Sequence, residues 1–386
     1  MASNIYGNGT TTATAGANTI VHYYDRAGIK AANRVNVYSQ WADKKSMPTK
    51  FGKTFKISRF EHMYDRSVAD ADFAAKGFMT ARTADDVSAA LTSAALAEGS
   101  GAANQRTLKK VTYETSLARY GEMIDYTDEV ELFSEDYIQV KYREELGELA
   151  NSRMEDLIQL DMLSTSTVMY SGDATSLGTV GATAGVDYRV SYDLIRKAVR
   201  KLVRNRAKKN TMIVTGSTKI GTQPIAKAFY AIIGADVKAD LESTVRGSVA
   251  ANGMTEFVYI PAHKYAGAAS LAEGEVGAMH EVRFIESEAA VVYEGKGAAV
   301  VVGQNDHLAN DGTKVNVYPI LFPTEGAFAT IGLKGNEKIK FLSQSPEQVT
   351  TVNPYGTTGF FSYNFFYAGI ILRPEAMLKV LVAASV

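Results

Sequence analysis

The chain has no cysteine, and this absence excludes several kinds of cohesion and chemistry. Disulfides, thiolate zinc sites, iron–sulfur clusters and cysteine nucleophiles all require a thiol. Packing and association between surfaces must therefore hold the protein together.

Net charge and long apolar runs are also lacking. The 41 lysines and arginines almost balance the 42 aspartates and glutamates. This argues against the chain-wide basic field of many nucleic-acid-binding proteins but leaves local patches open. A notable apolar run, residues 365–372, is far shorter than the roughly 20 residues that cross a bilayer, and residues 1–17 lack the pattern of a secretory signal. We therefore expect a soluble protein with no membrane partner.

The 386 residues, of which 46% are hydrophobic, suffice for two or three folding units at roughly 150 residues each. Residues 1–20 are small and polar, a composition typical of an arm that is ordered only by contact with a partner. Residues 20–41 mix aromatic and basic side chains without a clean period, and we expect an irregular lead-in there.

Two stretches with strand-like patterns predict a β-hairpin. The first, residues 53–60, carries three basic side chains among its apolar ones: Lys53, Lys56 and Arg59. The second, residues 108–126, is rich in residues that favour strands. Residues 61–106 between them indicate a projecting insertion with one helix at 84–97, because structureless loops of that length are uncommon in compact domains.

Residues 134–163 carry apolar side chains at spacings of three and four, which predicts a long helix. Ser134 supplies a cap, with acidic residues in the first turn. About 30 helical residues would make a rod of roughly 45 Å, longer than a small core needs. Residues 122–161 contain 13 acidic and 3 basic residues, so this region nets −10 and predicts a strongly acidic face.

A second amphipathic helix, residues 191–209, has the opposite charge. One side carries the apolar pairs 194/195, 198/199 and 202/203. The other side and the end are basic: Arg196, Lys197, Arg200, Lys201, Arg204, Arg206, Lys208 and Lys209. With Asp193 as its one acid the segment nets +7. Its basic face suits a protein surface of opposite charge, such as the acidic helix of a neighbouring copy, or solvent. Nucleic acid is a further alternative, although interleaved aromatic residues are missing.

Beyond residue 210, short strands alternate with glycine-bearing turns. The strand-like stretches are 211–215, 256–260, 276–286, 298–302, 314–321 and 360–372. Helical patterns occur at 223–233 and 374–383. Since no βαβ unit repeats, the sequence indicates an α+β protein with mostly antiparallel strands.

Motifs for catalysis, a cofactor or a metal are missing. The turn at 216–223 follows a strand-like stretch and precedes a helical one, but it lacks the lysine and hydroxyl that a phosphate-binding loop needs after its second glycine. The five histidines have no metal-ligand spacing, and residues 295–300 lack the third glycine of a dinucleotide fingerprint. Many acids on one long helix are typical of a solvated or interface face. We predict no catalytic, cofactor-binding or metal-binding residues.

Four stretches, in their order and spacing, point to one family. They are KSMPTKFGKTFKISRF at 45–60, LARYGEMIDYTD at 117–128, GEVGAMHEVRFIES at 274–287 and FYAGIILRPE at 366–375. With the arm, the hairpin and the long helix, they resemble the major capsid proteins of tailed bacteriophages with the HK97-like fold. At the level of residues, the chain is similar to the family typified by the capsid protein of coliphage N4, over most of residues 20–386.

The resemblance implies an α+β, HK97-like capsid fold in five parts. These are an N-terminal arm (1–44), an extended hairpin loop (45–130) with the insertion 61–106, a peripheral domain with a spine helix (131–210), an axial domain (211–345), and a C-terminal strand and helix returning to the core (346–386).

It further implies a structural virion protein, not an enzyme, assembled in the host bacterial cytoplasm. Copies would form hexamers and pentamers of an icosahedral shell around double-stranded DNA, which they would touch non-specifically. A portal protein and a decoration protein are further candidate partners. Because only about 45 residues precede the hairpin, whereas the type member of the fold has a long scaffolding segment there, a separate scaffolding protein is expected.

In that architecture the hairpin would lie over a neighbouring subunit, where its basic residues would meet acids. The residues expected at assembly interfaces are Lys53, Lys56, Arg59, Arg119, Arg196, Arg200 and Arg204. Two alternative functions are a DNA-associating protein that acts through helix 191–209 and a phosphate-binding enzyme that uses the 216–223 turn.

Deleting residues 1–20, or reversing the charges of Lys53, Lys56 and Arg59 together, should leave a folded subunit that fails to form closed shells. Stable interfaces need about 1,000 Å² of buried surface, which arms that wrap neighbours can provide. Electron microscopy of the expressed variants checks this, and normal particles from either one would contradict the roles of the arm and the hairpin.

Overall fold

A computed structural model describes most of the chain. The described residues are 36–60, 78–79, 83–96, 98–99, 104–105, 107–133, 138–210, 227–244, 259–262, 274–336, 338–349 and 353–386. The expectations for the arm, for most of the lead-in, for the Ser134 cap, and for the strand at 211–215 and the turn at 216–223 lie outside these residues.

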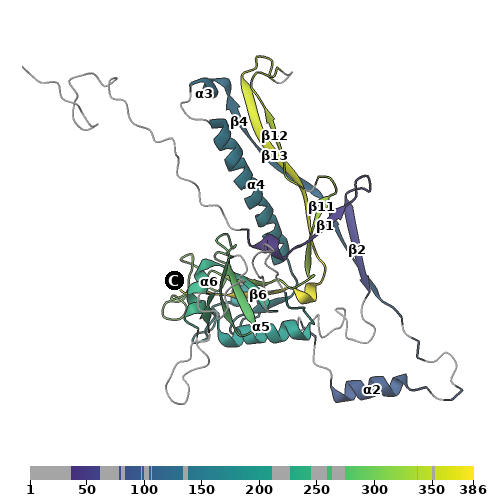
Figure 1. The fold of residues 1–386 in the computed structure, drawn as a ribbon. Coiled ribbons are helices and arrows are strands. Elements are labelled where there is room, and N and C mark those ends of the chain that lie inside the picture. Colours follow the sequence, from purple (N-terminus) through teal and green to yellow (C-terminus); the bar gives the residue numbers. More distant parts are fainter. Residues whose placement is uncertain are drawn as a thin grey trace, which may run out of the picture.

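A seven-stranded mixed sheet forms the compact body of the molecule (Figure 1). Its order is β5–β14–β10–β6–β9–β8–β7. The strands are β5 (Val168–Tyr170), β6 (Phe229–Ile233), β7 (Ile260–Pro261), β8 (Glu275–Met279), β9 (Val282–Glu286), β10 (Tyr318–Phe322) and β14 (Leu378–Val382). The pairs β5–β14 and β6–β9 are parallel, and the other pairs are antiparallel.

Both faces of this sheet are covered, which is why all five residues of β6 are buried. On one face, Phe229 and its neighbours pack against α5 (Tyr192–Arg204) and α6 (Ala235–Glu242). On the other, Tyr230 packs with the C-terminal part of α4 (Ile138–Leu163) and with the 3-10 helix η2 (Tyr38–Trp41). The sheet is therefore the middle layer of the body.

Loops cover the β5–β14 edge of the sheet. The connection from β5 to α5, which includes the 3-10 helix η3 (Leu177–Thr179), packs against the connection from β9 to β10. Their contact buries Val180, Tyr188, Val315 and Val317.

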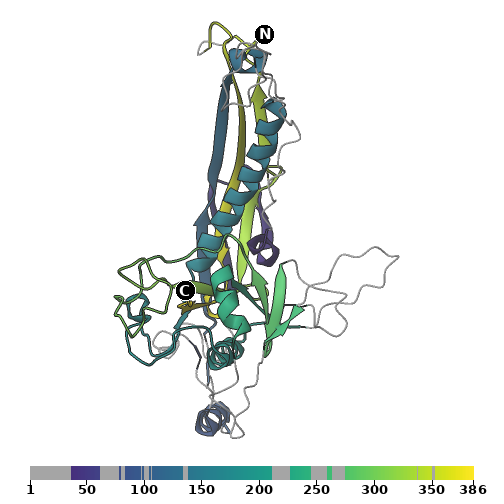
Figure 2. The ribbon, with the colours of Figure 1, turned by 90° about the vertical axis from the view of Figure 1, so that its left-hand side faces the viewer.

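A long projection rises from the body (Figures 1 and 2). It consists of α4 packed on an antiparallel ribbon of β4 (Ala118–Thr127), β13 (Thr358–Ile371) and β12 (Lys340–Gln344), with β13 in the middle. A short helix, α3 (Asp128–Phe133), follows β4. The 26 residues of α4 span about 39 Å, close to the roughly 46 Å of the 14-residue β13. Helix and strand thus run side by side along the projection.

The buried face of strand β13 changes along its length. Phe361, Tyr363 and Phe365 point toward α4, as period-2 alternation requires. Nearer the body, Ala368 and Ile370 pack on the opposite side. Gly369 allows α4 to approach closely there, since a Cβ atom would collide with the Asp161 carboxylate.

The opposite side of β13 supports the predicted hairpin. Strand β1 (Asp43–Met47) runs parallel to β11 (Phe328–Leu333), which pairs with β13. Strands β2 (Thr54–Phe60) and β3 (Lys110–Ser116) form the hairpin, and their apolar face, including Phe55 and Ile57, packs on β1, β11 and β13. This confirms the pairing of the two stretches, but the second is two strands: β3 belongs to the hairpin and β4 to the ribbon.

Three of the predicted helices are confirmed. The long rod is α4, the basic helix is α5, and the helix in the insertion is α2 (Ala84–Ala94), which has no buried side chain and lies apart from the body (Figure 1).

One acidic residue of α4 is buried instead of lying on an exposed face. Glu155 is 2% exposed and accepts hydrogen bonds from the backbone N–H groups of Tyr38 and Ser39, at 2.9 and 3.2 Å, so it fixes the start of η2.

Several predictions in the C-terminal half are wrong. Residues 229–233 of the helix expected at 223–233 form β6, and the helix expected at 374–383 is a 3-10 turn, η5 (Pro374–Ala376), followed by β14. Both are short apolar runs buried on two faces, for which periodicity does not separate helix from strand. Residues 276–286 form two strands that turn at His280, where φ is 56°. Residues 298–302 make only an isolated bridge at Ala299, and helix α6 was not predicted.

The apolar stripe of α5 is narrower than predicted. Leu202 is fully buried, whereas Val203 is 55% exposed. Leu202→Ala should lower the free energy of unfolding by about 2–5 kcal/mol, and the neighbouring Val203→Ala should change it by less than about 0.5 kcal/mol. Urea denaturation of both variants measures this. Equal losses would contradict the orientation of α5.

Candidate functional site

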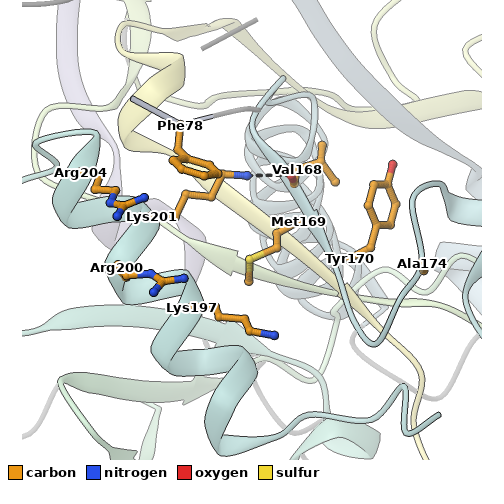
Figure 3. A pocket seen from close by; sticks show the side chains of 9 residues that line it. All are labelled: Phe78, Val168, Met169, Tyr170, Ala174, Lys197, Arg200, Lys201 and Arg204. Atoms are coloured by element: carbon orange, nitrogen blue, oxygen red, sulfur yellow. Dashed lines mark hydrogen bonds between the residues drawn. The ribbon is translucent and has the colours of Figure 1, made fainter. Parts of the chain in front are cut away.

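The basic face of α5 borders a pocket (Figure 3). The cavity has a volume of about 330 Å³ and lies between α5, β5 and Phe78. Its described lining is Phe78, Val168, Met169, Tyr170, Ala174, Lys197, Arg200, Lys201 and Arg204. Four of these side chains are cations, and no acid occurs among the described lining residues. The pocket therefore brings together Arg200 and Arg204, two of the predicted site residues.

Lys201 is the buried member of this cluster. It is 8% exposed, and its Nζ donates a hydrogen bond to the carbonyl oxygen of Val168 at 3.0 Å. Burial lowers the pKa of the Lys201 ammonium, because desolvation disfavours the charged form. The predicted exposed basic side of α5 is thus wrong at this residue, which lies three positions after buried Ala198 and seven after buried Leu194.

Phe78, from the insertion, is held against the end of α5. Its ring centroid is 5.5 Å from Cζ of Arg204 and 5.9 Å from Nζ of Lys201, within the range of cation–π contacts. The next residue, Met79, donates its backbone N–H to Oδ1 of Asn205 at 3.0 Å. The insertion is therefore anchored at this point, and its aromatic ring forms one wall of the pocket.

Arg196, also a predicted site residue, is not part of the pocket. It is exposed on another side of α5, where its guanidinium forms an ion pair with Asp193 at 2.9 Å. Because Arg196 lies on the same helix but outside the pocket, a variant of Arg196 can serve as a control for variants of the four pocket cations.

The three basic residues of the hairpin have different environments. Lys53 is exposed, and Lys56 forms an exposed ion pair with Glu114 of β3 at 2.9 Å. Their hydrogen bond lowers the pKa of Glu114 and raises that of Lys56. Arg59 lies on the opposite face from Lys56, with the apolar residues.

Arg59 binds Glu375 of η5 within the same chain. Its two terminal nitrogens donate to the two carboxylate oxygens of Glu375, with Nη2–Oε2 at 3.2 Å, and Glu375 is 3% exposed. Arg373 adds a weaker contact to Glu375 at 3.4 Å. In a single subunit Arg59 thus anchors the base of the hairpin to the body, so reversing its charge would destabilise the subunit itself, and the shell test of the hairpin rests on Lys53 and Lys56. Arg119, the remaining predicted residue, is exposed on β4, with its guanidinium 5.7 Å from the ring of Phe366.

A second, larger cavity is a groove on the projection between α4, β12 and β13. Its volume is about 670 Å³. Its apolar lining consists of Leu146, Phe341, Leu342 and Phe361, and its charged lining of Arg143, Glu144 and Glu148. Phe341 and Leu342 are more than half exposed, so this subunit leaves the groove open.

The turn between β1 and β2 exposes an aromatic ring and basic side chains, which are complementary to the apolar and acidic lining of the groove. Phe51 is 77% exposed and stands between Lys50 and Lys53. Lys50 and Gly52 both have positive φ, at 73° and 85°, which makes the turn tight and presents the phenylalanine. An exposed aromatic ring flanked by cations is a candidate contact residue.

Metal and membrane sites do not appear in the described part of the chain. Within it, no three His, Asp or Glu side chains are grouped to hold a metal ion, and no helix there is long and apolar enough to cross a bilayer. His22, His62 and His263 lie outside the described residues.

Three contributors to these surfaces were missed by sequence reasoning: Glu375, Phe78 and the exposed Phe51. Glu375 is 316 residues from Arg59, so local patterns carry no signal for the pair. The same holds for Phe78 and α5. Phe51, in contrast, sits in a turn signal between Pro48 and Gly52, where exposure could have been expected.

Comparison with known proteins gives consistent matches. No family model matches the chain. In sequence, the major capsid protein of Pseudomonas phage KPP21 is 30% identical over 383 residues, which cover 94% of this chain and 93% of that protein.

Solved structures match at much lower identity and therefore compare the fold alone. The capsid of Ralstonia phage GP4 superposes with a TM-score of 0.62 at 10% identity, covering 98% of this chain and 99% of that one. The capsid of cyanophage Pam1 gives 0.57 at 10% identity (96% and 98% covered), and that of Helicobacter pylori bacteriophage KHP30 gives 0.53 at 11% identity (99% of each).

The Arg59–Glu375 pair can be tested against the Lys56–Glu114 pair on the other face of the hairpin. Arg59→Ala should lower the free energy of unfolding by about 3 kcal/mol, because it leaves a buried carboxylate without its main partner. Lys56→Ala should cost at most about 1 kcal/mol, since exposed pairs contribute little. Chemical denaturation compares the two, and a loss at Arg59 no larger than that at Lys56 would show that the pair does not anchor the hairpin.

Proposed function

This chain belongs to the family of major capsid proteins of tailed bacteriophages, which form the shell of the phage head, and we propose how its copies assemble. They form hexamers and pentamers of an icosahedral shell around double-stranded DNA. Its fold is α+β and HK97-like, and its place is the virion capsid. The family is a structural one, so the chain is not an enzyme.

Our finer assignment is to the N4-type branch of this family. It is supported by the four sequence stretches at 45–60, 117–128, 274–287 and 366–375. With it we propose assembly in the bacterial cytoplasm, a separate scaffolding protein, a portal protein and a decoration protein as partners, and the five-part domain organisation given by the resemblance.

The observation that carries the assembly proposal is a matched pair of surfaces on one chain. The groove on the projection has an apolar floor, and its charged lining consists of two acids, Glu144 and Glu148, and one cation, Arg143. The β1–β2 turn presents Phe51 between Lys50 and Lys53. We propose that the turn of one copy seats in the groove of the next.

Physical complementarity supports this contact. A phenylalanine ring in an apolar pocket removes on the order of 150–250 Å² from water, and such aromatic anchors in desolvated pockets dominate many interfaces. Opposite charges at the rim orient the contact and disfavour wrong pairings. Because turn and groove are different surfaces, the contact is heterologous, and repeated contacts of this kind close into rings when the rotation allows it.

Of the two alternative functions, the phosphate-binding enzyme does not fit a structural family, and its 216–223 turn lies outside the described residues. Contact with DNA through helix 191–209 is compatible with a capsid role. The pocket on α5 is the observation that favours it, as an additional property of the shell protein.

The turn-and-groove contact predicts a charge-swap result. Lys50→Glu with Lys53→Glu should abolish shells, because like charges then meet at the rim, and adding Glu144→Lys with Glu148→Lys should restore them. Negative-stain electron microscopy counts shells, and circular dichroism confirms folding.

Phe51→Asp should also abolish shells, whereas Val302→Asp, at an equally exposed apolar residue of the body, serves as the matched control. Normal shell yield from Phe51→Asp or from the lysine variant would refute the contact.

A further inference from the structure

We infer that the pocket between α5, β5 and Phe78 binds phosphate groups of a nucleic-acid strand. The inference rests on the proposed function only in that the shell encloses DNA, and it concerns a site separate from the groove and the turn. Four observations support it: the spacing of the cations, their number, the buried lysine and the aromatic wall (Figure 3).

The cations form a row along the helix. Lys197, Arg200 with Lys201, and Arg204 are three and four residues apart, so they share one side of α5. From the first to the last the helix rises about 10 Å. A strand of duplex DNA rises 3.4 Å per phosphate along the duplex axis, so a row of this length, laid along that axis, spans about three steps between consecutive phosphates.

The charge of the site favours phosphates over carboxylates. Four cations face the pocket, while acids are absent from its described lining. A single carboxylate from a neighbouring copy would neutralise one of them, whereas consecutive phosphates neutralise several. Arginine also presents a planar fork of donors that matches phosphate oxygens, and two of the four cations are arginines.

Lys201 gives the pocket a buried positive charge. Its ammonium has three donors, and the hydrogen bond to Val168 accounts for one. Burial makes the charged form costly, and an anion in the pocket would offset that cost. A buried cation that faces a cavity is therefore the feature that separates this site from a simple basic surface.

Phe78 preorganises the cluster. Its ring lies against both Lys201 and Arg204, which restricts two long side chains that would otherwise lose conformational entropy on binding. Met79 ties the ring to the end of α5 through Asn205. The aromatic wall, together with Val168 and Met169, also reduces the access of water to the charges.

The test uses the purified full-length chain and a fluorescent duplex DNA of about 20 base pairs. Anisotropy titrations between about 50 and 200 mM salt give the affinity and the slope of log K against log salt. The pocket variant is Lys197→Gln, Arg200→Gln and Arg204→Gln together. The matched control removes three cations of the same segment that do not line the pocket: Arg196→Gln, Lys208→Gln and Lys209→Gln.

The pocket variant should bind DNA at least about tenfold more weakly, and its salt slope should fall by about 2.7, since each lost phosphate contact removes about 0.9. The control should change the slope by less than about 1. Phe78→Leu and Lys201→Met should each weaken binding as well, although neither removes an exposed charge. Circular dichroism and denaturation verify that every variant is folded.

Three outcomes would overturn the inference. These are unchanged DNA binding in the pocket variant, an equal loss in the control, and binding of inorganic phosphate without binding of DNA. Shell formation is scored separately by microscopy, so wild-type chains that bind DNA but never form shells would instead count against the proposed function.

Discussion

Strand β13 supports both the projection and the hairpin β2–β3. It pairs with β4 over residues 358–367, with β12 over residues 360–364 and with β11 over residues 368–371. One row of its side chains faces α4, and the other, nearer the body, faces the hairpin β2–β3. Neither α4 nor the hairpin would be stable alone, because a single helix needs an apolar partner and a two-stranded hairpin is only marginally stable in water. The continuous strand gives both of them a common support.

This arrangement explains how a chain without cysteine keeps an extended shape. The projection has helix on one side of a ribbon, and its aromatic row, Phe361, Tyr363 and Phe365, supplies the buried area. Directional polar contacts near the body add to this packing. Glu155 holds η2, Arg59 holds η5, and the hydroxyl of Tyr367 donates to Asp161 at 2.8 Å. Packing and a few directional bonds thus take the place of covalent links.

Local periodicity was sufficient to predict the elements that have one face buried and one face exposed to solvent. The hairpin, α4 and α5 each have one buried and one exposed face, so period and charge identify them. It failed for β6 and β14, because strands buried on both faces are uniformly apolar. For the surfaces, the basic face of α5 was predicted, but the burial of Lys201, the ring of Phe78 and the pairing of Arg59 with Glu375 depend on segments far apart in the chain. Only the tertiary fold brings these together.

We propose that the fold carries, on one chain, complementary surfaces through which copies build a closed shell. The most direct test is an electron cryo-microscopy reconstruction of shells assembled from this protein. We expect Phe51 of one copy to lie in the groove lined by Phe341 and Leu342 of its neighbour, with Lys50 and Lys53 beside Glu144 and Glu148. A shell in which this groove is open to solvent, or a protein that yields only small particles of uniform size, would contradict it.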